Sequence, residues 1–202
     1  MYIRHISTNE QESIKGLSIF KELTGKNIIL ESESTYCKWP PQIADFSLKW
    51  TFSGKETYFL QQHKIAVNEH HCLIVNAGQE YTSEIMSHQW VHSLAIFFNA
   101  LFLKDAFATL TKGDDSLLEN PYQQEPQGVW FFEQVYEADE LLNRKMLQLL
   151  NRLKGGNCPE TETEEYLFNL LFIFLQKYNY KVLKNSGNLS FVKRSTRIEI
   201  YR

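Results

Sequence analysis

The feature that most constrains the fold is a strict alternation of apolar and polar residues between positions 46 and 52. In an extended strand, successive side chains point to opposite faces, so a period of two sorts them into two rows. The apolar row is Phe46, Leu48, Trp50 and Phe52, and the polar row is Ser47, Lys49 and Thr51. The pattern therefore predicts a strand that has one interior face.

Similar short runs, separated by turn residues, continue from residue 27 to residue 99. The predicted strands are 28–31, 46–52, 56–60, 64–67, 72–76, 81–85 and 90–98. Glycine or asparagine can adopt the positive φ that tight turns need, and such residues occur at 53–55, 68–69 and 77–79. We therefore predict an antiparallel, mainly β domain, arranged as a barrel or a sandwich.

The period lengthens after residue 98 and becomes helical. Apolar spacing predicts a short helix at 102–110, followed by a helical pair at 132–153 and 159–178. Gly155 and Gly156 end the first helix of the pair, and a Thr161/Glu164 capping box opens the second. Capping boxes also predict a short helix after Ser7 and another that begins at Thr196 and is still unfinished at the last residue.

Charge and cysteine content exclude several classes of function. The formal net charge is −3, so the chain lacks the basic surface that binds a phosphate backbone. The three cysteines fit no metal-binding spacing, which indicates a reduced, cytoplasmic protein. No apolar run is long enough to span a bilayer, and the N-terminus does not read as a signal peptide.

Three stretches resemble the AraC family of transcription regulators, which join a cupin-type sensor barrel to two helix-turn-helix units. Residues 64–81 are similar to the family's strand, turn and strand, and residues 94–103 to its last barrel strand and following helix start. Residues 192–202, VKRSTRIEIYR, resemble the linker ahead of the DNA-binding helices. The resemblance implies a cupin-like β-barrel (jelly roll) followed by a two-helix dimerisation element.

The same resemblance implies the domain organisation and the partners. We expect an N-terminal segment at 1–26, a barrel at 27–112, a helical dimerisation element at 113–185, and a linker with the start of a DNA-binding domain at 186–202. The expected function is that of an effector-sensing domain, which binds a small molecule and relays the signal to a C-terminal helix-turn-helix domain outside this sequence. DNA would be a partner only through that missing domain.

An aromatic set is the predicted ligand site, on the assumption that the apolar faces point into the barrel. Its members are Trp50, Phe52, Tyr58, Tyr81, Trp90 and His92. Rings of this kind give apolar contact, and their polar tips orient a ligand. The alternative is that they fill a solid core, as in many small barrels. The absence of clustered inward arginine or lysine argues against a strongly anionic effector. The sequence does not identify the effector.

Metal and catalytic sites are not expected. Metal-dependent cupins use a His-x-His pair with a glutamate and a later histidine, whereas His70 and His71 are adjacent and point to opposite faces of a strand. No nucleophile elbow, P-loop or dinucleotide fingerprint occurs. We therefore expect no cofactor and no enzyme activity. A metal-dependent cupin enzyme and an effector-free dimerisation module are the competing hypotheses.

The helical pair is the predicted dimer interface, because its second helix is apolar on more than one side. The predicted seam consists of Leu142, Met146, Leu149, Leu153, Leu167, Leu170, Leu171 and Phe174. A two-fold arrangement would bury the same surface on both subunits of a homodimer. The alternative is that both helices pack on the barrel of their own chain.

Overall fold

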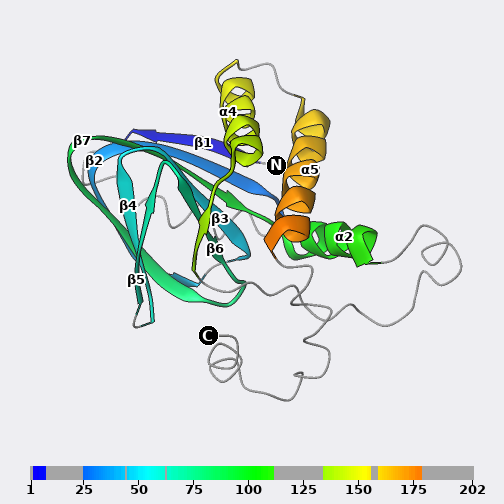
Figure 1. The fold of residues 1–202 in the computed structure, drawn as a ribbon, viewed down its shortest axis with the longest axis horizontal. Coiled ribbons are helices and arrows are strands. Elements are labelled where there is room, and N and C mark those ends of the chain that lie inside the picture. Colours follow the sequence, from blue (N-terminus) through cyan, green and yellow to red (C-terminus); the bar gives the residue numbers. More distant parts are fainter. Residues whose placement is uncertain are drawn as a thin grey trace, which may run out of the picture.

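The fold combines a curved β-sheet with three helices (Figure 1). It is seen in a computed structural model that describes residues 2–7, 25–43, 45–61, 63–111, 134–155 and 159–178. The strands are β1 (Tyr2–Ser7), β2 (Ile28–Ile43), β3 (Ser47–Ser53), β4 (Lys55–Leu60), β5 (His63–Asn68), β6 (His71–Val75), β7 (Glu80–Phe97) and β8 (Val135–Glu137). The helices are α2 (Ala100–Thr111), α4 (Glu140–Lys154) and α5 (Glu160–Tyr178).

Two long strands, β2 and β7, form the longest strand pair of the sheet. They pair antiparallel along most of their length, from Ile28 opposite Phe97 to Ile43 opposite Glu80. β7 also pairs with β3 at its C-terminal half and with β4 at its N-terminal half, so it curves from one partner to the other. This curvature rolls the sheet into a nearly closed barrel (Figure 1).

The described strand pairs are antiparallel, as predicted, with one exception. β1 pairs with β2 in parallel, and its register places Tyr2 beside Ile28 and Ser7 beside Glu33. No apolar alternation marked this segment, and it was not predicted to be a strand. Its pairing shows that an edge strand can be selected by the backbone hydrogen bonds that the sheet offers.

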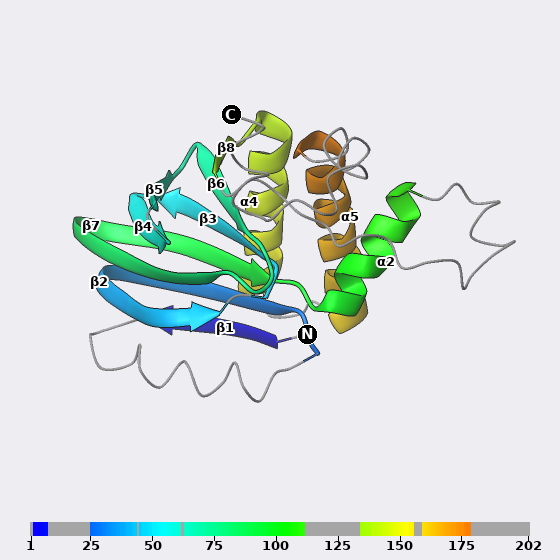
Figure 2. The ribbon, with the colours of Figure 1, turned by 90° about the horizontal axis from the view of Figure 1, so that it is seen from below.

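The helices lie together on one side of the barrel (Figure 2). The main hydrophobic core forms between them and the sheet. From the strands and the residues next to them it takes Ile29, Phe46, Leu48, Trp50, Cys72, Ile74, Leu94, Ile96 and Phe98, and from α4 and α5 it takes Leu142, Met146, Leu149, Tyr166, Leu167, Leu170, Leu171, Phe174 and Leu175. Each contributing strand therefore buries one face under helices and its other face inside the barrel.

Polar contacts fix where α4 begins. Asp139 is its N-cap, and the side chain accepts a hydrogen bond from the backbone N–H of Leu142 at 2.9 Å. Lys177, near the end of α5, forms an ion pair with the same carboxylate, and these two contacts hold the Asp139 pKa below its ordinary value. The C-terminal end of α5 is thereby tied to the start of α4.

Several predicted boundaries are corrected. The segments 81–85 and 90–98 form one strand, β7, and the strand predicted at 28–31 continues to Ile43 as β2. The helix predicted from 132 begins at Glu140, because residues 135–137 form β8 and pair with β6 instead. The helices predicted at 102–110 and 159–178 are confirmed as α2 and α5.

The helices predicted near Ser7 and after Thr196, and the linker at 186–202, fall outside the described residues. Within the part of the chain that is described, no helix is both long and apolar enough to cross a membrane.

Candidate functional site: the polar cavity inside the barrel

A small cavity lies inside the barrel, among residues of β2, β3, β4 and β7. Its lining consists of Leu30, Ser32, Trp39, Gln42, Lys49, Glu56, Tyr58, Tyr81, Ser83, Ser93, Ala95 and Phe97. Apolar clusters flank it, one around Val67 and Leu73 and the other around Ile85 and Val91. The cavity volume is about 30 Å³, which is room for one or two water molecules. The barrel interior is therefore almost filled, and its remaining space is polar.

Lys49 is the central side chain of this cavity. It extends from the middle of β3 into the barrel and is only 2% exposed. Its Nζ donates a hydrogen bond to the Tyr81 hydroxyl at 2.9 Å and lies 3.8 Å from the centre of the Phe97 ring. An ammonium group over an aromatic face gains cation–π attraction, which offsets part of its lost hydration.

Glu56, on β4, supplies the opposite charge. The carboxylate is buried, accepts a hydrogen bond from the Tyr58 hydroxyl and acts electrostatically on Lys49. Lys49, Glu56, Tyr58 and Tyr81 therefore form a buried polar network of one cation, one anion and two phenols.

Burial changes the protonation of this network. Desolvation lowers the pKa of Lys49 to about 7, although the Glu56 carboxylate opposes the shift. Desolvation, reinforced by the same carboxylate, raises the pKa of Tyr58 and Tyr81, so both phenols stay protonated. Lys49 therefore exchanges its proton near neutral pH, inside the barrel.

Serine and threonine hydroxyls extend the polar surface along β2, β3 and β7. Ser32 and Ser93 hydrogen-bond to each other across the strand pair at 2.9 Å. Ser47 and Thr51 share the Lys49 row of β3, and their buried hydroxyls have no hydrogen-bond partner among the described residues. A buried hydroxyl without a partner costs free energy, which a bound polar molecule or water would recover.

The aromatic site predicted from the sequence divides between the two faces of the sheet. Tyr58 and Tyr81 line the cavity. Trp50 is buried in the helix-covered core, and Phe52 packs against that core with its ring 5.1 Å from the ring of His92. Trp90 is 60% exposed. Four of the six rings therefore do not line the cavity.

The assumption about the interior face of β3 is wrong. The apolar row of Leu48 and Trp50 was expected to point into the barrel, but it packs under the helices, and the polar row that includes Lys49 points inward. Lys49 and Glu56 were therefore missed. The available signal was a lysine between Leu48 and Trp50 in the middle of a strand pattern, in a chain whose later helices need an apolar surface to cover.

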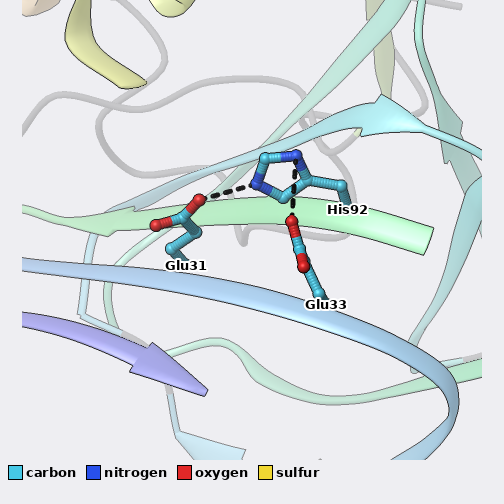
Figure 3. Close-up of side chains that lie close together, drawn as sticks. All are labelled: Glu31, Glu33 and His92. Carbon is cyan, nitrogen blue, oxygen red and sulfur yellow. Dashed lines mark hydrogen bonds and ion pairs between the residues drawn. The ribbon is translucent and has the colours of Figure 1, made fainter. Parts of the chain in front are cut away.

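His92 belongs to a second group of polar side chains, on the helix-facing side of the sheet (Figure 3). His92 Nε2 lies 2.8 Å from Glu31 Oε1, and His92 Nδ1 lies 3.9 Å from Glu33 Oε1. One ligand atom from each residue lies within 4.8 Å of the others, close enough for a shared metal ion. The histidine spacing considered in the sequence did not identify this group.

The structure gives no sign of an activated cysteine among the described residues. Cys37 and Cys72 are both free and buried. Burial raises the pKa of the Cys72 thiol to about 12, and the thiol form is a poor nucleophile.

The predicted dimer seam lies within the core of a single chain. Seven of its eight side chains, all but Leu153, are at most 3% exposed, and Leu153 packs against the same core. The outer surface of α4 instead exposes Leu141 and Leu147, at 40% and 51%.

No protein-family model and no curated protein sequence matches this chain. Several solved structures, however, are similar to this chain. A crystal structure of apo ToxT from Vibrio cholerae, a lysine-to-alanine variant, aligns with a TM-score of 0.55 at 9% identity, covering 81% of this chain and 58% of that one. The chain thus spans less than two thirds of the length of ToxT.

Two further structures align less closely. Wild-type ToxT with a bound unsaturated fatty acid has a TM-score of 0.48 at 11% identity, covering 79% of this chain and 57% of that one. The AraC-like transcriptional activator CuxR has a TM-score of 0.42 at 12% identity, covering 76% and 55%. The fold assignment depends on the first alignment. The aligned part of this chain therefore has the same fold as the corresponding part of ToxT.

Proposed function

We propose that this chain is the effector-sensing region of an AraC-type transcription regulator, and that a small acidic molecule binds in the barrel through Lys49. The observation that carries the proposal is the burial of this ammonium group inside a polar cavity. A buried cation lowers stability unless something compensates for its lost hydration. A ligand carboxylate would do so with a charge-assisted hydrogen bond, and the Tyr81 hydroxyl can donate a second one.

The size of the cavity means that an organic acid can bind only if the structure around it changes. A volume of about 30 Å³ cannot admit an organic acid unless lining side chains such as Tyr58 or Trp39 move. A ligand that binds only the opened arrangement shifts the population toward it, which is the thermodynamic requirement for a sensor.

The contacts between β7, α2 and α5 support a proposed route for the relay from the cavity to the helices. Ser93, Ala95 and Phe97 of β7 line the cavity, and the chain continues directly into α2. The Phe102 ring of α2 contacts the Phe168 ring of α5 edge to face, with 5.8 Å between centroids. We propose that movement of β7 is passed to α5 through this contact, and onward to a DNA-binding domain outside this sequence.

We also propose that the chain forms a homodimer through the helical pair, as the family resemblance implies. Because the predicted seam is buried in the chain's own core, the contact would use the outer surface of α4, including Leu141 and Leu147. Two-fold symmetry would pair this surface with itself.

Thermal shift measurements test the ligand proposal. The probes are unsaturated fatty acids of graded length, chosen because ToxT has been crystallised with one, and their methyl esters. At pH 6 we expect the acids, but not the esters, to raise the melting temperature of the wild type, since only the native state binds. The stabilisation should weaken above pH 7, where Lys49 loses its proton.

Variants make the test specific to the cavity. Lys49→Met should abolish the shift, whereas Lys64→Met, which changes an exposed lysine of β5, should leave it unchanged. Glu56→Gln should strengthen binding, because it removes the anion that competes for Lys49. If no acid stabilises the wild type, or if Lys49→Met responds equally, the proposal is wrong.

A further inference from the structure

We propose that Glu31, Glu33 and His92 bind one divalent transition-metal ion on the helix-facing side of the sheet (Figure 3). This site is separate from the barrel cavity and does not depend on the proposed function. The neighbouring residues Ser32 and Ser93 line the cavity on the opposite face of the same two strands. Because alternate residues of a strand point to opposite faces, the metal site and the cavity lie back to back.

Strand geometry brings the three ligands together. Glu31 and Glu33 are two residues apart on β2 and therefore share a face. His92 on β7 is the antiparallel register partner of Glu33, while Glu31 pairs with the next residue but one, Leu94. A carboxylate pair on one strand and an imidazole on its neighbour therefore converge without any loop between them.

The distances suit a coordination sphere after one small adjustment. Ligand atoms at about 2.1 Å from a metal ion, at tetrahedral or octahedral angles, lie about 3.0–3.4 Å apart. Glu31 Oε1 and His92 Nε2, at 2.8 Å, are already close to that separation. Figure 3 shows Glu33 on another side of the ring, nearer Nδ1. Its side chain is 42% exposed and can rotate toward Nε2 at little cost.

Charge and burial favour a cation at this position. The Glu31 side chain is only 7% exposed and lies within 4.8 Å of a second carboxylate, so two like charges share a partly desolvated site. A divalent ion carries enough charge to neutralise both carboxylates, whereas a single imidazole ring does not. The Phe52 ring packs beside His92, and exposed Glu33 leaves a side open for coordinated water.

The donor set indicates the class of metal. Imidazole nitrogen is a good ligand for Zn²⁺, Co²⁺ and Ni²⁺, whereas Mg²⁺ and Ca²⁺ prefer oxygen ligands alone. Three protein ligands with an open position are typical of zinc sites that keep a bound water. We therefore expect Zn²⁺ to bind and Mg²⁺ and Ca²⁺ to fail at the same concentration.

Calorimetric titration of the tag-free chain with Zn²⁺ at pH 7.5 tests the site. The wild type should bind one equivalent, and binding should raise its melting temperature. His92→Gln should weaken binding at least a hundredfold and Glu33→Gln at least tenfold. Glu33 is half-exposed, so its variant should fold even if changes at His92 disturb the core. His88→Gln and Glu80→Gln alter exposed residues of the same strand and serve as matched controls.

A second readout uses Co²⁺, whose visible absorption reports direct coordination. We expect the Co²⁺-loaded wild type and both control variants to share one spectrum, and His92→Gln to lose it. Absence of binding by the wild type at 100-fold molar excess of Zn²⁺ would overturn the proposal. So would equal affinity in the Glu33→Gln and His92→Gln variants, because the ion would then be held elsewhere.

Discussion

The two faces of the central strands differ sharply in chemistry, although both are buried. Under the helices the sheet presents Ile29, Leu48, Trp50 and Ile96, which merge with the apolar surfaces of α4 and α5. Inside the barrel the same strands present Ser32, Lys49 and Ser93, around a small polar cavity. The apolar face holds the fold together, and it offsets the cost in stability of the buried polar groups on the other face.

The difference also shows why apolar alternation alone assigned the wrong face of β3 to the barrel interior. In a simple barrel the apolar face of a strand is the interior one, because the outside is solvated. Here the three helices cover part of the outside, so the apolar row faces them. The interior could then accept Lys49, which its hydrogen bond to Tyr81 and its contact with the Phe97 ring partly compensate.

The largest expected loss of stability comes from a charge placed on the helix side of the apolar core. Leu149 of α4 is fully buried, and Leu149→Glu would place an unpaired charge in the main core. Such a charge costs several kcal/mol, so we expect the chain to unfold, as judged by circular dichroism and urea denaturation. The matched variant Leu147→Glu changes a leucine that is 51% exposed on the same helix and should remain folded.

Sedimentation of Leu147→Glu then tests the dimer proposal. If the outer surface of α4 joins two chains, a wild-type dimer should become a folded monomer in this variant. A folded, dissociated Leu149→Glu variant would contradict our assignment of that residue to the core of its own chain.

An intermediate effect comes from the polar face and depends on pH. The folded-state pKa of Lys49 is about 7 and its ordinary value is 10.5, so between these values the unfolded state binds more protons. Stability therefore rises with pH in this window, with a limiting slope of about 1.4 kcal/mol per pH unit. The urea midpoint of the wild type should increase from pH 7 to pH 10 relative to Lys49→Met.

The control is Lys64→Met, whose exposed lysine should leave the pH dependence of the wild type in place. A wild-type curve parallel to that of Lys49→Met throughout this window would mean that Lys49 keeps an ordinary pKa and is not desolvated.

The smallest expected effect concerns how tightly the interior is packed. Gly54, in the β3–β4 turn, has φ of +77°, and a methyl group there would meet Val91 Cγ2 at 2.8 Å. Gly78 has a similar φ of +80° but open space around it. Both alanine variants incur backbone strain of about 1 kcal/mol, and Gly54→Ala adds a steric term of about 1–2 kcal/mol. Equal urea midpoints for the two variants would show that Val91 can move away from the added methyl group without loss of stability.

Parts of the fold were predictable because local patterns specify local structure. The alternation of residues 46–52 and the helical spacing of 159–178 each depend on side chains within one element, and β3 and α5 confirm both. The second half of β2, by contrast, carries polar residues such as Lys38 and Gln42 among its apolar ones and shows no run that marks a strand. It is extended because β7 provides register partners on both sides of the irregularity at residues 40–41.

The start of α4 illustrates the same limit. Apolar spacing extended the predicted helix back to residue 132, but residues 135–137 pair with β6 as β8. Val135 and Tyr136 satisfy a helical period and a strand equally well over so short a segment. The pairing surface offered by β6, a strand about sixty residues earlier, decides between the two.

The sequence by itself determined which side chains share a row, where most turns lie and that strands precede helices, because these properties depend on neighbours along the chain. Only the tertiary structure decided which row of a strand faces the cavity, since that depends on where the helices pack. It also brought His92 beside Glu31 and Glu33, about sixty residues away, because strand register is set by the sheet as a whole.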